Sequence, residues 1–313
     1  MKRAATLAIA LAIVACGGKS APPPQPTEEE TPVTGFAWSP PCRVPVLEHN
    51  LAHGGNRFVW AYLVNVDSRG DGNLVVDLVD IDLREVNGHD ATRPEDADRA
   101  SLMERMLEAF PAMIVDREGA YLESEGFDEI LERLIAVSPN PSVQRMIRET
   151  PAMHTPFRRQ FGELWQAWVG HWIDWSIEPG ADATIVETIP GPDGEAVPYR
   201  VVRSHLGVEN GYARLRVVET HRGDAIKTMM LPVLVGLADQ VADPAGFVEL
   251  LKSFDVDGQV EISFEVETEL ATLRPRRGVL DKRMEFGFLG NSTNERSTRE
   301  FTFDWERAIG CGE

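Results

Sequence analysis

Polar and apolar residues alternate over long stretches of this 313-residue chain. The clearest examples lie near the C-terminus and read QVEISFEVETELATL (259–273), GVLDKRMEFGFL (278–289) and TREFTFDWERA (298–308). A period of two places the apolar side chains on one face of a β-strand. Because the connections between these runs are short, we expect the strands to pair as antiparallel neighbours in one sheet.

Further strands are expected upstream. Arg57–Val66 and Leu74–Val86 flank the turn sequence DSRGDGN and predict a long hairpin. The alternation in the second run changes phase at Leu78 and Val79, which indicates a β-bulge. Three more alternating runs read ATIVETI (183–189), YRVVRSHLGV (199–208) and YARLRVVETHRG (212–223).

Blocks with helical periodicity interrupt the strands. They lie at residues 92–110, 127–137, 156–175, 224–241 and 244–254. Sequence-adjacent strands together with helices inserted in blocks favour an α+β fold. We therefore expect residues 42–313 to form a single globular α+β domain, in which an antiparallel sheet of long strands packs on, or curves around, several helices.

The third helical block contains four of the seven tryptophans of the chain, in the sequence FGELWQAWVGHWIDW (161–175). If the helix runs to its end, Trp165, Trp168, Trp172 and Trp175 fall within about 80° of arc at 100° per residue. One interpretation is a core seam, with the first three rings buried and Trp175 partly exposed at the helix end. The other is that the four rings line a cavity for an apolar ligand.

The N-terminus reads MKRAATLAIALAIVACGG, with two basic residues, an apolar run from Ala4 to Ala15 and then a cysteine. This run is too short to span a bilayer and is typical of a secretory signal. The residues IVAC before GG resemble the lipobox of bacterial lipoproteins. The resemblance covers residues 1–18 and implies that residues 1–15 are removed and that Cys16 becomes an acylated N-terminus. The remainder of the chain matches no motif of a characterised family.

Residues 16–41 then form a lipidated cysteine and a tether rich in proline and glutamate. Gly17, rather than aspartate, follows the cysteine, which under the sorting rule for such lipoproteins implies delivery to the outer membrane. The expected location is therefore the bacterial cell envelope, membrane-anchored through the lipid, with either a periplasmic or a surface-facing orientation.

Cys42 and Cys311 are the two cysteines left for the folded part. In an oxidising envelope, an isolated pair is a candidate disulfide that would join the two ends of the domain. Two buried free thiols are the alternative.

Charge and motifs exclude several functions. Removal of residues 1–15 takes away Lys2 and Arg3 and shifts the formal charge from −19 to −21, which argues against nucleic-acid binding. No catalytic, cofactor-binding or metal-binding motif is present. His49 and His53 have metal-ligand spacing but lie in extended sequence. His171 and Asp174 lack an accompanying nucleophile, so we predict no enzyme, no cofactor and no metal.

Two functions remain open. The first is a non-enzymatic, membrane-anchored lipoprotein that acts as a binding or scaffold module for another envelope protein. The second is a carrier or sensor of an apolar ligand, an acyl chain or lipid, held between a curved sheet and the tryptophan helix. The second arrangement resembles, in architecture alone, the half-barrel acyl-chain carriers of the lipoprotein-sorting family.

Overall fold

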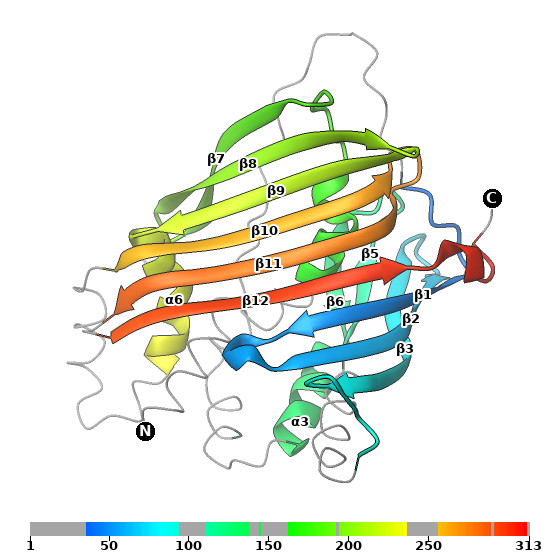
Figure 1. Cartoon of the computed structure of the whole chain (residues 1–313), viewed down its shortest axis with the longest axis horizontal. Coiled ribbons are helices and arrows are strands. Elements are labelled where there is room, and N and C mark those ends of the chain that lie inside the picture. The colour runs from blue at the N-terminus through cyan, green and yellow to red at the C-terminus, as the bar shows by residue number, and fades with distance from the viewer. Residues whose placement is uncertain are drawn as a thin grey trace.

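A computed structural model of the chain describes residues 36–93, 110–137, 144, 162–191, 194–236, 256–288 and 291–311. Most of these residues belong to one twelve-stranded antiparallel sheet (Figure 1). Its strands are β1 (Cys42–Leu51), β2 (Arg57–Ser68), β3 (Leu74–Val86), β4 (His89–Asp90), β5 (Ala112–Val115), β6 (Tyr121–Glu125), β7 (Asp182–Pro190), β8 (Ala196–Glu209), β9 (Tyr212–Arg222), β10 (Asp257–Glu269), β11 (Arg274–Phe288) and β12 (Asn291–Phe303).

The strand order from one edge to the other is β6-β5-β3-β2-β1-β12-β11-β10-β9-β8-β7, and β4 pairs with the end of β3. Neighbours in the sheet are mostly neighbours in the sequence, as the short connections predict. The pairing of β3 with β5 skips only the two-residue β4, and the long-range exception is the pairing of β1 with β12, in which Val46 lies opposite Phe303. The first and last long strands therefore meet in the middle of the sheet.

The prediction of an α+β fold is wrong, because the described residues form a mostly β structure. Their helices are α3 (Phe127–Val137), residues 162–168 and α6 (Asp224–Gly236), with the short 3-10 turns η2 (His53–Gly55), η4 (Gly170–Trp172) and η6 (Trp305–Arg307). The predicted helix at 244–254, and nearly all of that at 92–110, lie outside the described residues. No described helix is long and apolar enough to cross a membrane.

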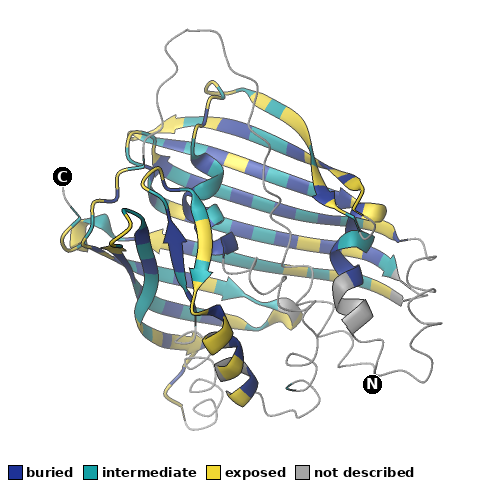
Figure 2. Ribbon diagram, turned by 180° about the vertical axis from the view of Figure 1, so that it is seen from behind, coloured by how far each residue is buried: buried dark blue, intermediate teal, exposed yellow. Residues whose placement is uncertain are grey.

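The sheet has one buried and one solvated face. In β10, Val260, Ile262 and Phe264 are buried, whereas the intervening Glu261 and Ser263 are partly exposed. Figure 2 shows this alternation continuing along the neighbouring strands. The buried side is called the covered face, because α6 packs there against β7–β9 and the 162–168 helix against β11 and β12. The other side is called the open face.

Ion pairs cross the open face between neighbouring strands. Arg276 on β11 lies 2.6 Å from Glu267 on β10, and Arg214 on β9 lies 3.2 Å from Glu265. A sheet with one wet face is common in antiparallel architectures and explains the strict alternation seen in the sequence.

The bulge predicted in β3 is confirmed. Its register against β2 shifts between Ala61 and Leu63, where Leu63 faces Val79 and Ala61 faces Asp82. Asp80, inside this interval, has a φ of 52°, a conformation that accommodates the extra residue.

The two ends of the described chain are joined. Cys42 and Cys311 form a disulfide with Cα atoms 4.3 Å apart, and Arg43 exchanges backbone hydrogen bonds of 2.9 Å with Ile309. Trp38, which lies in the predicted tether, is 1% exposed, and its Nε1 donates to the Leu273 carbonyl at 3.1 Å. Packing therefore begins at least as early as Phe36, and not at the predicted boundary of Cys42.

We expect the disulfide to contribute strongly to stability. A double variant, Cys42→Ser with Cys311→Ser, should unfold at lower urea concentration and lose about 4 to 5 kcal/mol, because the bond closes a loop of 269 residues. Intact-mass measurement after alkylation without reductant should label neither cysteine. Labels on both would contradict the bond.

Candidate functional site

The part of the tryptophan segment that the structure describes, residues 162–175, is α-helical only over residues 162–168. Val169 leaves helical geometry at φ −135° and ψ −51°, and the chain continues as the 3-10 turn η4. The predicted continuous helix to Trp175 is therefore wrong at its C-terminal end; its first residues, 156–161, lie outside the described residues. Trp172 Nε1 donates to the Ala167 carbonyl at 3.1 Å, so the indole satisfies one of the acceptors that the helix end leaves open.

All four tryptophans of this segment are buried. Trp165, Trp168 and Trp172 are 0% exposed and Trp175 is 4% exposed. The expectation that the first three rings are buried is confirmed, and the expected partial exposure of Trp175 is wrong. Trp175 packs on Trp172 with ring centroids 5.6 Å apart, because the turn at η4 folds it back towards the core.

Trp165 and Trp168 belong to a larger group that we call the aromatic cluster. Its members are Phe36, Trp38, Trp165, Trp168, Phe301, Phe303 and Trp305. Trp38 lies between Trp165 at 5.4 Å and Trp305 at 5.1 Å, and Trp168 meets Phe303 edge-on at 5.4 Å. The cluster thus joins the entry of the chain, the tryptophan segment and the last strand.

Gly119 makes this close packing feasible. Its carbonyl accepts from Trp165 Nε1 at 2.7 Å, and its φ of +90° is a conformation that favours glycine. A Cβ at this position would lie 2.7 Å from the ring of Phe36, so any larger residue would displace the aromatic cluster.

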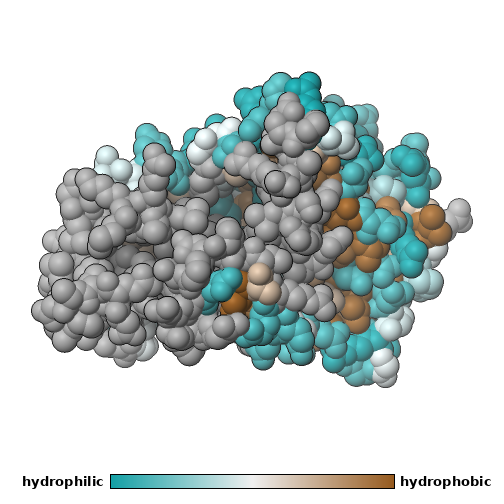
Figure 3. Space-filling view, turned by 90° about the horizontal axis from the view of Figure 1, so that it is seen from below, coloured by the Kyte–Doolittle hydropathy of each residue, from teal (hydrophilic) through white to brown (hydrophobic). Residues whose placement is uncertain are grey.

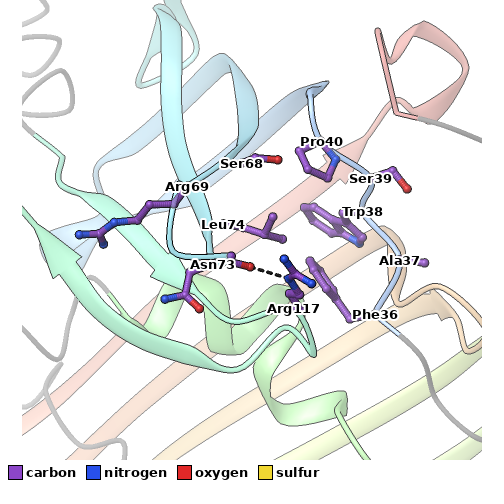
Figure 4. A pocket seen from close by; sticks show the side chains of 11 residues that line it. Phe36, Ala37, Trp38, Ser39, Pro40, Ser68, Arg69, Asn73, Leu74 and Arg117 are labelled. Carbon is purple, nitrogen blue, oxygen red and sulfur yellow. Dashed lines mark hydrogen bonds between the residues drawn. The ribbon is translucent and has the colours of Figure 1, made fainter.

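Two surface pockets among the described residues lie away from the four tryptophans of the segment. The first, of about 340 Å³, borders the aromatic cluster through Phe36 and Trp38 and lies between residues 36–40 and the β2–β3 turn (Figure 4). Arg117 Nε there donates to the Gly72 carbonyl at 2.8 Å, and Arg69 pairs with Asp71 at 3.4 Å. The second, of about 560 Å³, lies among charged residues at one end of β1 and β12. Both are open to solvent and have a mixed polar and apolar lining.

Ionisable side chains are buried on the covered face beside the tryptophan segment. Lys282 Nζ donates to Glu163 Oε2 at 2.6 Å, and Glu219 Oε2 lies 3.5 Å from His221 Nε2. Burial raises the pKa of Glu163, although the positive charge of Lys282 lowers it in part. Burial also raises the pKa of Glu219, although the interaction with His221 lowers it in part. Glu163 Oε1 and both ring nitrogens of His221 have no hydrogen-bond partner among the described residues.

A second buried ionic group is better satisfied. Arg299 donates to both carboxylate oxygens of Glu48, from Nε at 2.7 Å and from Nη2 at 3.0 Å, and Tyr62 Oη donates to Glu48 at 3.1 Å. Burial is the main cause that raises the pKa of Tyr62, and the negative charge of Glu48 raises it further. This bidentate arrangement fixes β12 to β1 and to β2.

Neither His221 nor His171 is paired with a nucleophile among the described residues. His221 does not hydrogen-bond a hydroxyl or thiol, and no group of three potential metal ligands occurs in the described part of the chain. His171 lies against the Phe264 ring at 4.3 Å, and burial, with the charge of Arg203, lowers its pKa to about 3. Asp174 is exposed, so the considered pair of His171 with Asp174 is not assembled.

Sequence reasoning missed the buried charges, although their signal was present. Glu219 and His221 stand in phase with Leu215 and Val217 on β9, and Lys282 stands in phase with the buried residues of β11. The alternation therefore placed them on the covered face. Of the predicted site residues, Cys16 lies outside the described residues.

Trp168→Ala tests the packing of the tryptophan segment. Because the ring is packed against Phe301 and Phe303, its loss should lower the free energy of unfolding by about 3 to 5 kcal/mol in urea denaturation. Leu122→Ala, at a half-exposed edge residue, is the control and should cost under about 0.5 kcal/mol. Equal costs for the two variants would contradict a packed core at Trp168.

Glu219→Gln tests the cost of the buried carboxylate. A folded-state pKa above the unfolded value means that the wild type loses stability as pH rises through the interval between the two values. Glutamine does not titrate, so the stability of the variant relative to the wild type should increase as the pH rises above about 4, the ordinary pKa of a glutamate. Glu285→Gln removes an exposed carboxylate and is the matched control. A flat difference for Glu219→Gln would contradict the raised pKa.

Comparison with solved structures gives a loose structural likeness. No protein-family model and no curated protein matches the chain. A solved structure described as "Lipid-protein interactions in lipovitellin" superposes with a TM-score of 0.42 and 7% sequence identity over 88% of this chain. The chain spans only 26% of the length of that lipovitellin chain. At this score the likeness carries no argument about what the present chain binds.

Proposed function

We propose that this protein is a bacterial envelope lipoprotein, anchored in the outer membrane by an acyl group on Cys16, whose sheet domain is a non-enzymatic binding or scaffold module. The anchoring part is supported by the charged start, the short apolar run and the IVAC–GG sequence of residues 1–18. The role of the domain is argued from the packing of its covered face.

The burial of the tryptophan segment is the observation that carries the proposal. A carrier needs an accessible apolar chamber, and its lining residues keep part of their surface free for the ligand. Trp165, Trp168 and Trp172 are 0% exposed, and two of their indole nitrogens donate to backbone carbonyls inside the protein. These rings support a closed core, which leaves the outer surface to meet a partner.

The outer surface has features suited to recognition. Seen from below (Figure 3), hydrophobic residues gather between hydrophilic ones towards the end that carries the C-terminus. The large apolar side chains that are exposed include Leu122 at 50% and Ile309 at 70%. Clustered apolar surface rimmed by polar residues is typical of protein interaction sites.

The carrier function has one observation in its favour. The apolar lining of the covered face continues from the tryptophan segment to Met229 and Met230 of α6, and methionines adapt readily to different apolar shapes. The buried Lys282, Glu163 and Glu219 weigh against it, because an acyl chain lying over these groups would deprive them of polar contacts.

Membrane attachment is tested by substitution at Cys16. Wild-type protein expressed in a bacterium should sediment with membranes, enter detergent and incorporate labelled fatty acid. Cys16→Ser should lose the label and should be soluble or retain its signal peptide. Normal processing and membrane sedimentation of Cys16→Ser would rule out acylation at this cysteine.

Lipid content separates the two functions of the domain. The matched sample is residues 17–313 exported behind a cleavable signal without a cysteine, purified in the absence of detergent and extracted for mass spectrometry. The binding-module proposal expects no stoichiometric lipid. One lipid per chain, lost on Trp168→Ala with the fold retained, would favour the carrier.

A further inference from the structure

The two outer strands of the sheet are built very differently. β6 has five residues and includes Glu123 and Glu125, and short charged edges resist further strand pairing. β7 has nine residues, and its exposed apolar side chains are Ile185 at 37% and Val186 at 69%. A long apolar edge of this kind is a template for an additional strand.

The backbone of β7 is oriented for such pairing. His205 N donates to the Ala181 carbonyl at 3.0 Å, and Gly191 N donates to the Glu195 carbonyl at 2.7 Å. Because antiparallel pairing alternates, the odd-numbered residues of β7 face β8 and the even-numbered residues direct their N–H and C=O groups outward. Pro190, which has no N–H, is an even-numbered residue at the end of β7, so its backbone nitrogen faces away from β8. The missing N–H therefore removes no hydrogen bond between β7 and β8.

The charges of β7 do not oppose a second strand. Glu187, whose side chain lies on the covered side, accepts from Tyr199 Oη at 2.6 Å and lies 3.8 Å from Arg203. Its charge is therefore balanced within the same chain. Asp182, at the start of the strand, is the other acidic residue of β7.

We propose that β7 pairs with β7 of a second copy of this chain, antiparallel across a two-fold axis at Val186, so that the sheet continues through a dimer. In this register Val186 faces Val186 of the second copy, Thr184 faces Thr188, and Asp182 faces Pro190. Apolar and threonine pairs stabilise neighbouring strands, and no two like charges are directly opposite. A two-fold interface requires the strand to be complementary to itself. Pairing with an unrelated strand has no such requirement.

The first test is cross-linking of the full-length protein in its membrane. Val186→Cys should give a covalent dimer under mild oxidation, because the two substituted residues face each other across the axis. Leu122→Cys is the matched control, since Leu122 is an exposed apolar residue on the opposite outer strand, and it should remain monomeric. Absence of the Val186→Cys dimer, or equal dimer from both variants, would overturn the proposal.

The second test measures mass without a new cysteine. The detergent-solubilised wild type should show the protein mass of two chains in analytical ultracentrifugation, and Val186→Lys should show that of one chain with an unchanged circular dichroism spectrum. Leu122→Lys should remain dimeric. A wild type that is monomeric up to its solubility limit, or a Val186→Lys variant that dimerises as the wild type does, would refute the pairing. Neither result bears on acylation of Cys16, so it leaves the proposed anchoring to its own test.

Discussion

The structure depends on covering one face of a very large antiparallel sheet. Each long strand presents a row of apolar side chains to the covered face. In a single layer of twelve strands these rows form a large apolar surface, which other segments of the chain must shield from water. The described part of the chain meets this need near the sheet centre with Trp165 and Trp168, and farther along with α6. The tryptophans are used there because each indole excludes water over a large area and its N–H can be satisfied by a backbone carbonyl, as in Trp165 and Trp172.

Much of the sheet could be predicted from the sequence, because its alternation reports directly on a face that is either buried or solvated. The runs in β9–β12, the β2–β3 hairpin and its bulge near Val79, and α3 over residues 127–137 all follow from local patterns. The helical wheel over 156–175 failed at its C-terminal end for a physical reason. Rings buried on different sides of a turn can satisfy the same periodicity as rings on one helix. The break at Val169 and the capping of Ala167 by Trp172 distinguish the two arrangements.

The candidate site was less predictable because its polar part depends on distant pairings. Glu163 and Lys282 are separated by 119 residues and meet only after the tryptophan segment is laid on β11. Removing either partner would leave the other buried without its counter-charge. The pair therefore determines where the tryptophan segment docks more than it adds to the free energy of unfolding. Glu48 with Arg299 imposes a similar constraint on the pairing of the first and last strands.

The position of the first strand also determines how the domain would respond to force. If a membrane tether ends at Phe36, tension reaches the core through Trp38, which is held between two other tryptophans. The disulfide between Cys42 and Cys311 then passes part of the load to the other end of the described chain. β1 is hydrogen-bonded to β2 on one side and β12 on the other, so a pull along it shears two ladders at once instead of unzipping an edge. A tether attached at this end would therefore load two hydrogen-bonded ladders in place of one.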